Sequence, residues 1–224
     1  MNWQTVNNLN NIETTDDLIV VYGHCRPESL GTLSKYLSES ETIKYKKYRN
    51  RTPPECRAGL RILLSRYLNS PPETIEILET KFGKPYIEHK GLFFNVSHTD
   101  SSFVIGIGKM GRIGIDIECL SVNEDINSLT DFTFSEDEKR LYFDPDDEYL
   151  SFTKIWTLKE ALLKAAGIGL VDRLNELNVH EKLQHYKLNF TSITCPQNET
   201  GSIVYSGTPC QKSGIRYFNL ERLI

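Results

Sequence analysis

Two acidic residues lie two positions apart in a β-type stretch in the middle of the chain. Residues 112–118 read RIGIDIE, so the isoleucines face one side of a strand while Gly114, Asp116 and Glu118 face the other. The two acidic positions are then roughly 6–7 Å apart along the strand, and both side chains can reach one hard cation. We also expect Gly114 to leave room for a ligand beside the backbone. Taken alone, the pattern fits two ordinary acidic residues on a solvated strand face better than a metal site.

Two further stretches carry groups that could act on a phosphate. Residues 156–164 read WTLKEALLK, and Trp156, Glu160 and Lys164 lie four residues apart on one face of a predicted helix. Residues 94–98 read FNVSH and end a predicted strand in a histidine, whose ring can donate a hydrogen bond to a phosphate. Each stretch alone also fits a structural role: an exposed Glu–Lys pair with a core tryptophan, or a single surface histidine.

Residues 106–111 (GIGKMG) match the glycine pattern of dinucleotide-binding loops but lack its context. That pattern needs a helix directly after the glycines, whose N-terminus holds the diphosphate. Here alternating β-branched residues follow, so we expect a turn around Met110 and Gly111 that leads into a strand. The chain contains no G-x-x-x-x-G-K-[ST] pattern, which argues against a P-loop nucleotide hydrolase.

In this order and spacing, the FNVSH, IGIDIE and WTLKEALLK stretches resemble the motifs of 4′-phosphopantetheinyl transferases of the surfactin-synthetase-activating type. Further stretches that resemble this family are 57–61 (RAGLR), 83–85 (GKP), 134–138 (FSEDE) and 167–170 (GIGL). The resemblance runs from about residue 38 to residue 170. Each motif alone is modest, but three motifs in the family's order are specific.

The resemblance implies transfer of the 4′-phosphopantetheine arm of coenzyme A to a serine hydroxyl of an acyl or peptidyl carrier protein, with Mg²⁺ as cofactor and 3′,5′-ADP as product. The nucleophile then belongs to the partner, so no catalytic triad is needed. The resemblance makes Asp116, Glu118 and Glu160 the metal ligands. It makes Lys164 the residue that holds the transferring phosphate, and Glu138, or Glu160 through a water, the base.

The resemblance also assigns residues to coenzyme A itself: Lys44, Arg57, His98 and, as a further candidate, Arg51 for the 3′-phosphate, and Lys84, Pro85 and Ser97 for the adenine and diphosphate. One helical turn before Lys44, where some family members carry a basic residue, this chain has Glu41. The alternative for the basic stretch 44–51 is a solvated helix end.

The elements that must carry these residues predict an α+β fold. We expect helices over 29–48, from Pro53 to Leu68, from Ser135 and over 149–166, a loop with a short helix over 120–134, and strands at 18–23, 75–79, 93–97, 103–108, 112–118, 186–193, 203–205 and 215–220. The order of a helix followed by strands occurs twice, which predicts two halves. With the resemblance, these become two pseudo-symmetric lobes, each a small antiparallel sheet packed with helices. Residues 1–110 would carry the coenzyme A side and residues 111–224 the metal and catalytic side, with the active site at the lobe interface.

The composition is that of a globular protein, with 224 residues, 39% hydrophobic and 25% charged residues, and a net charge of −4. This charge excludes a surface that is basic throughout, so we expect no nucleic-acid partner. The charge is nevertheless uneven, because residues 44–66 are strongly basic and residues 116–148 strongly acidic. Two alternatives stay open: a nucleic-acid-binding module that uses the basic stretch 44–51, and a metal-dependent phosphodiester-cleaving enzyme.

The sequence also predicts where the protein works. No apolar run is long enough to span a bilayer, and the N-terminus lacks the basic and apolar regions of a signal peptide. The five cysteines form no C-x-x-C pair, so we expect a reducing, cytoplasmic setting and no membrane contact. The resemblance implies a monomer whose two halves mimic a dimer.

Overall fold

A five-stranded sheet contains most strands of the first half of the chain. The computed structural model describes residues 1–15, 17–25, 30–50, 52–109, 111–119, 126–169, 173–207 and 214–223. The strands of this sheet are, in spatial order, β1 (Trp3–Val6), β10 (Arg216–Leu220), β2 (Ile19–His24), β6 (Ser102–Gly108) and β5 (Phe93–His98). Strands β2, β6 and β5 are antiparallel neighbours, but β10 runs parallel to both β1 and β2. The α+β class is confirmed, although this sheet is mixed rather than antiparallel because the last strand of the chain inserts into it.

A second, antiparallel sheet comes from the second half of the chain. Its spatial order is β7 (Ile113–Cys119), β9 (Glu199–Ser206) and β8 (Leu188–Cys195), and a two-stranded ribbon elsewhere pairs β3 (Leu78–Glu79) with β4 (Pro85–Tyr86). A strand therefore follows the GIGKMG stretch, as predicted, and Gly111 in the connection has a φ of 92°. Met110 lies outside the described residues. The connection leads from one sheet to the other, because β6 and β7 belong to different sheets.

Seven α-helices accompany the sheets in the described chain. The α-helices are α1 (Leu30–Leu33), α2 (Glu39–Tyr45), α3 (Thr52–Leu68), α4 (Ile126–Thr133), α5 (Glu136–Tyr142), α6 (Glu148–Ala166) and α7 (Val179–Tyr186). Short 3₁₀ turns lie at Leu9–Asn11, Ser34–Tyr36, Pro72–Thr74, Pro145–Asp147, Leu174–Glu176 and Pro196–Asn198. None of the helices in these ranges has the length and apolar composition that a bilayer crossing requires.

Helix ends follow local capping rules. Helix α6 ends at Gly167, whose φ of 71° is the left-handed conformation that glycine adopts without strain. The single helix predicted over 29–48 is instead divided, because Ser38 forms a capping box with Glu41 and starts a new helix there. The strand predicted at 75–79 is reduced to β3, and β1 and α7 were not predicted. Of the predicted loop at 120–134, residues 120–125 lie outside the described part.

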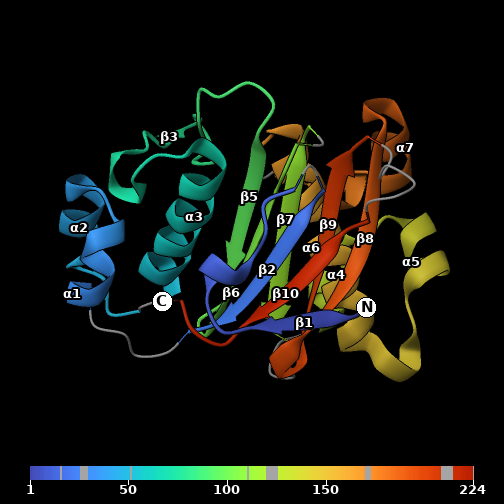
Figure 1. The fold of residues 1–224 in the computed structure, drawn as a ribbon. Helices are drawn as coiled ribbons and strands as arrows, with labels where there is room; N and C mark the ends of the chain where they lie inside the picture. The colour runs from blue at the N-terminus through green and yellow to red at the C-terminus, as the bar shows by residue number, and fades with distance from the viewer. Residues whose placement is uncertain are drawn as a thin grey trace.

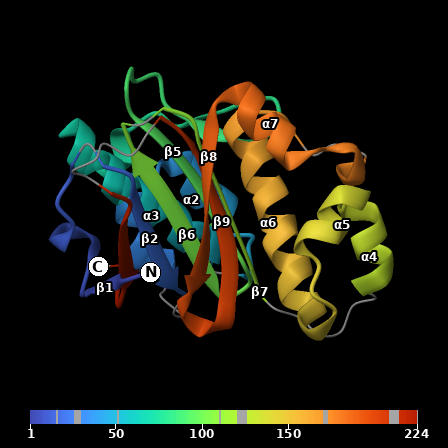
Figure 2. The ribbon, with the colours of Figure 1, turned by 90° about the vertical axis from the view of Figure 1, so that its right-hand side faces the viewer.

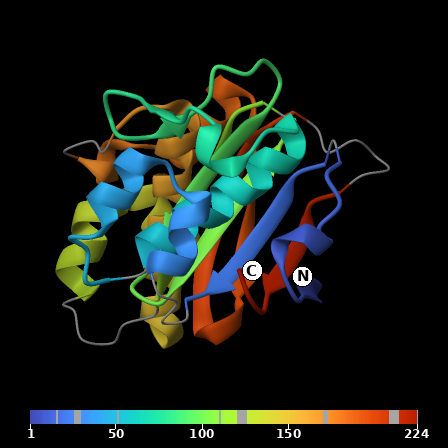
Figure 3. The same cartoon turned by 60° about the vertical axis from the view of Figure 1, so that its left-hand side comes forward.

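The two sheets pack against each other, and helices cover their outer faces (Figures 1 and 2). Strand β2 shows how one strand serves two cores. Ile19 and Val21 pack with α3 in the first core, whereas Val20 and Tyr22 face the core between the sheets, which the isoleucines of β7 also enter. The third core lies between the second sheet and helices α6 and α7. Figure 3 shows helices α1–α3, in blue and teal, in front of the sheets.

The C-terminal strand connects the two predicted halves. Strand β10 pairs with β2 over five residues and therefore belongs to the sheet of the first half. The division into residues 1–110 and 111–224 stays a prediction, and residues 216–220 are the part of the second half that crosses it.

A buried ion pair holds the helices of the second half together. Lys159 on α6 is 2.7 Å from Glu138 on α5, and the two side chains are 0% and 3% exposed. The ammonium of Lys159 also donates to the carbonyls of Thr133 and Leu174, at 2.6 and 2.8 Å. Burial lowers the pKa of Lys159 and the charge of Glu138 opposes that shift, so the pair depends on both partners.

We expect Glu138→Gln to lower the free energy of unfolding by about 3–5 kcal/mol, because it leaves the Lys159 ammonium buried without a counter-charge. Urea unfolding measures this change. Glu136→Gln on the same helix is the matched control, since Glu136 is 85% exposed, and it should cost no more than about 0.5 kcal/mol. A loss below about 1 kcal/mol for Glu138→Gln, the size of an exposed ion pair, would contradict this role.

Candidate active site

On the edge of β7 that faces away from β9, side chains form hydrogen bonds with the backbone groups. Strand β7 has a strand neighbour on one side, and β5, the edge strand of the other sheet, packs beside it. Lys84 donates to the Ile113 carbonyl at 3.0 Å, and Lys164 donates to the Ile115 carbonyl at 3.2 Å. The amide of Asn95 accepts from the Ile115 N–H at 2.8 Å. Buried backbone groups need such partners, so the edge of β7 that pairs with no strand brings these three side chains together.

Asp116 lies at the centre of this seam between the sheets. Its side chain is buried, and its Oδ1 accepts from the Lys164 ammonium at 2.6 Å and from the Ser97 hydroxyl at 2.8 Å. Lys164 and Ser97 are also 3.2 Å apart. One carboxylate oxygen therefore links β5, β7 and α6. Its other oxygen, Oδ2, is buried and has no hydrogen-bond partner in the described chain.

Gly114 brings helix α6 against β7. A Cβ at this position would clash with the backbone of Ala161 and Ala165. Any other residue at position 114 would therefore force helix α6 to move. The expectation of room for a ligand beside Gly114 is therefore wrong, because α6 fills that space. The close approach instead positions the C-terminal half of α6, with Glu160 and Lys164, over the acidic strand.

Two more carboxylates face the same region. Glu118 accepts from the indole N–H of Trp156 at 3.4 Å, and its pKa is raised to about 7 by burial and by the charge of Asp116. Burial and Asp116 also raise the pKa of Glu160, although Lys164 opposes this. The Oε1 atom of Glu160 is buried without a hydrogen-bond partner in the described residues. Burial and the charge of Asp116 thus make Glu118 and Glu160 harder to ionise, and a bound cation would offset this cost.

A cavity of about 470 Å³ joins these groups. Its lining includes eight of the predicted site residues: Lys84, Pro85, Ser97, His98, Asp116, Glu118, Glu160 and Lys164. A second cavity of about 650 Å³ has an aromatic and aliphatic wall that includes Phe152 and Trp156. His98 and Glu118 line both cavities, so the two spaces meet at the end of β5 and β7.

Lys84 and His98, in the cavity of about 470 Å³, have lowered pKa values. Lys84 donates to the carbonyls of Ile113 and Lys164, and these neutral acceptors supply no counter-charge. Burial and the charges of Arg112 and Lys164 lower the pKa of Lys84 to about 8. Burial also lowers the pKa of His98. An anion bound in this cavity would favour the protonated form of both groups.

The carboxylates fit a hard divalent cation that takes its remaining ligands from a bound substrate. No group of three acidic, histidine or cysteine side chains in the described ranges is gathered closely enough to hold an ion by itself. Mg²⁺ binds through one or two carboxylates together with water and substrate phosphates. The two unpartnered oxygens, on Asp116 and Glu160, match that requirement.

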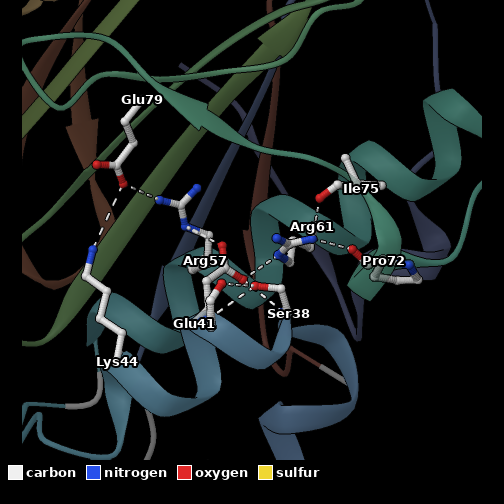
Figure 4. A network of polar contacts seen from close by, with 9 residues as sticks. Ser38, Glu41, Lys44, Arg57, Arg61, Pro72, Ile75 and Glu79 are labelled. Atoms are coloured by element: carbon white, nitrogen blue, oxygen red, sulfur yellow. Dashed lines mark hydrogen bonds and ion pairs between the residues drawn. The ribbon is translucent and has the colours of Figure 1, made fainter.

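Of the predicted 3′-phosphate residues, His98 lines the cavity, whereas Lys44 and Arg57 are not part of its lining. Arg57 on α3 contacts Glu41 and Glu79, each at 3.4 Å, and the Lys44 ammonium is 4.0 Å from Glu79 (Figure 4). Lys44 and Arg57 therefore form a cluster with acidic partners. Arg51 lies outside the described residues.

Glu138 is a correction to the predicted site. It does not line the cavity, and its Oε2 is held by Lys159 and by the N–H of Ser135, at 2.7 and 2.9 Å. It is 2% exposed, so it cannot receive a proton from a protein partner. The FSEDE stretch predicted an acidic helix start correctly, but the burial of Glu138 depends on Lys159, which sequence spacing does not reveal.

Asn95 is a site residue that sequence reasoning did not single out. It is buried, and its side chain fixes β7 against β5 through the Ile115 N–H. The available signal was its position two residues before Ser97, on the same strand face.

Four cysteines lie in the described part of the chain. Cys25, Cys56, Cys119 and Cys195 are all unpaired in the described part of the chain.

The chain is similar to a protein family and to several individual proteins, and the family match covers the strand and the helix that carry Asp116, Glu118 and Glu160. A family model described as the 4′-phosphopantetheinyl transferase superfamily matches residues 112–206. The chain is 32% identical to the 4′-phosphopantetheinyl transferase HetI of Nostoc over 165 residues, which are 69% of each chain. It is 33% identical to the 4′-phosphopantetheinyl transferase AcpT of Salmonella typhimurium over 110 residues, which are 48% of this chain and 56% of AcpT.

Other relatives are matched over a smaller part of their length. The 4′-phosphopantetheinyl transferase gsp of Aneurinibacillus migulanus is 32% identical over 117 residues, which are 52% of this chain and 48% of gsp. A Synechocystis protein named for the same activity is 32% identical over 55% of its length. HetI apart, the chain thus spans about half the length of these relatives. The extent of the HetI match, together with the family model, shows that the chain belongs to the 4′-phosphopantetheinyl transferase superfamily.

Proposed function

We propose that this chain transfers the 4′-phosphopantetheine arm of coenzyme A to a serine hydroxyl of an apo carrier protein and releases 3′,5′-ADP. The observation that carries the proposal is the Asp116 carboxylate, which bonds Lys164 and Ser97 through one oxygen and keeps the other free. Glu118, Glu160 and Lys84 line the same cavity. Cations and carboxylates side by side suit a diphosphate that arrives with a metal ion.

The metal in this proposal is Mg²⁺, held by Asp116, Glu118 and Glu160 together with the diphosphate. When bound, it supplies charge neutralisation for the diphosphate. The unpartnered oxygens of Asp116 and Glu160 support this assignment, as does the raised pKa of Glu118. Removal of the ion should therefore leave a cluster of carboxylates that repels the substrate's phosphates.

The chain's own residues then position the reaction. The serine oxygen of the carrier forms a bond to the β-phosphorus of coenzyme A while the bond from that phosphorus to the ADP oxygen breaks. Lys164 holds the transferring phosphate, Lys84 donates to the diphosphate, and His98 donates to the 3′-phosphate. Glu160, whose pKa is raised by burial, accepts the serine proton through a water and replaces Glu138 in that role. Positioning and charge provide the catalysis, as in other phosphoryl transfers.

The remaining parts of the proposal come from the family. They are a monomeric enzyme, a cytoplasmic location and a transient carrier-protein partner, without nucleic acid. The carrier can belong to fatty-acid, polyketide or peptide synthesis, and one assay separates these three classes.

The first prediction is a gain of mass on a carrier protein. Incubated with coenzyme A, Mg²⁺ and an apo carrier, the protein should add one phosphopantetheine group to one serine of at least one of the three carrier classes, as read by intact-protein mass spectrometry. Chelation with EDTA should abolish the gain and added Mg²⁺ should restore it. A carrier with its acceptor serine changed to alanine is the control.

No mass gain on any of the three carrier classes would contradict the proposed function. Cleavage of a phosphodiester substrate in the same buffer would favour the phosphodiester-cleaving alternative. Retention of single-stranded DNA at physiological salt without affinity for coenzyme A would favour the nucleic-acid-binding alternative.

The second prediction concerns Lys164. Lys164→Gln should lower kcat by about 10²–10³-fold, the usual effect of removing one group that stabilises the transferring charge. Lys154→Gln on the same helix is the matched control, because Lys154 is exposed, and it should keep the wild-type rate. Thermal unfolding of both variants checks that the fold is intact. A Lys164→Gln enzyme with more than a tenth of the wild-type kcat would contradict the assigned role.

A further inference from the structure

The Glu79 side chain lies between two cations of the first half, Arg57 and Lys44. Glu79 Oε1 is 3.4 Å from the Nη2 atom of Arg57 and 4.0 Å from the Lys44 ammonium (Figure 4). Lys44 and Glu79 are about half exposed, with 51% and 48% of their side chains accessible. This carboxylate is therefore held by long contacts and can leave them for water.

The two neighbouring arginines are held very differently. Arg61 makes short contacts, at 2.6 Å to Glu41 and at 2.6 and 2.8 Å to the carbonyls of Pro72 and Ile75. Arg57 contacts its two carboxylates at 3.4 Å, and its Nη1 atom is buried without a hydrogen-bond partner in the described chain. Arg61 is thus saturated by the fold, whereas Arg57 keeps a donor for an anion.

This cluster borders the cavity of the candidate active site. In the β3–β4 ribbon Glu79 lies directly opposite Pro85, and Pro85 lines the cavity. The positive charges of Arg57 and Lys164 also both act on the Cys56 thiol, whose pKa burial raises to about 12. Pro85 is thus shared by the cavity lining and the register of the Glu79 ribbon, and a ligand that extends from the cavity past Pro85 would approach this cluster.

We propose that Glu79 is a built-in competing anion that occupies Lys44 and Arg57 and sets the affinity for the 3′-phosphate of coenzyme A. This inference rests on the proposed function, since it takes coenzyme A as the ligand. A phosphate reaching these two cations must displace the Glu79 carboxylate or remain beside it, and both cost binding free energy. Glu79 therefore makes the site less selective for a terminal phosphate than its two cations alone would be.

The proposal predicts a gain in affinity on losing an acidic residue. Glu79→Gln keeps the shape of the side chain and removes its charge, so coenzyme A should bind roughly three- to fivefold more tightly, the effect expected of a partly exposed charge pair. Dephospho-coenzyme A, which lacks the 3′-phosphate, should bind equally to both proteins. The Kd of dephospho-coenzyme A divided by the Kd of coenzyme A should thus rise in the variant.

The test is isothermal calorimetry with coenzyme A and dephospho-coenzyme A on the wild type, Glu79→Gln and Glu76→Gln. Glu76 is the matched control, because it lies three residues earlier, is exposed and forms no ion pair among the described residues. The Glu76 variant carries the same change in net charge and should keep the wild-type ratio. Thermal unfolding of each variant checks that the ribbon is folded.

Each outcome decides the proposal. A higher ratio in Glu79→Gln alone supports it. An unchanged ratio overturns it, and weaker coenzyme A binding in Glu79→Gln overturns it too, because Glu79 would then hold the cations in place for the phosphate. Equal gains in both variants would show a general charge effect and also overturn it. If no protein binds coenzyme A, the proposed function fails together with this inference.

Discussion

The free edge of β7 is the constraint on which the site depends. Its backbone groups are buried between two sheets and need partners that no neighbouring strand supplies. Lys84, Asn95 and Lys164 provide those partners at Ile113 and Ile115. Because these three side chains come from the β3–β4 connection, β5 and α6, satisfying one strand edge brings both halves of the chain to the same place. The side chain of Asp116, next along that strand, then meets Lys164 and Ser97.

Charge is distributed around this edge so that a ligand completes it. The raised pKa values of Glu118 and Glu160 reflect carboxylates that burial and Asp116 destabilise. The lowered pKa of Lys84 reflects a buried ammonium whose acceptors are carbonyls. A bound cation would favour the ionised form of the two carboxylates, and a bound anion would favour the protonated form of Lys84. A metal-bound diphosphate, the ligand of the proposed function, would provide both at once.

Local patterns and the family resemblance predicted candidate site residues but not the long-range contacts that hold the surrounding elements in place. Alternation along β7 predicted that Asp116 and Glu118 share a strand face, and the four-residue spacing on α6 predicted that Glu160 and Lys164 share a helix face. The family resemblance, not the spacing, brought the strand and the helix into one predicted site. The burial of Glu138 was not predictable, since it depends on Lys159 from another helix. The same holds for β10, which pairs with β2 across almost the whole chain, and for the space beside Gly114, which α6 fills. These features are set by contacts between distant segments.

The central claim is that Asp116 presents its free oxygen to a metal that binds together with coenzyme A. Calorimetric titration of Mg²⁺ into the protein with saturating coenzyme A, for the wild type and for Asp116→Asn, tests this directly, with Mg²⁺ binding to coenzyme A alone subtracted. The account predicts that Asp116→Asn weakens the Mg²⁺ affinity of the complex by about tenfold or more. Equal Mg²⁺ affinities in the two complexes would contradict it and remove Asp116 from the metal site.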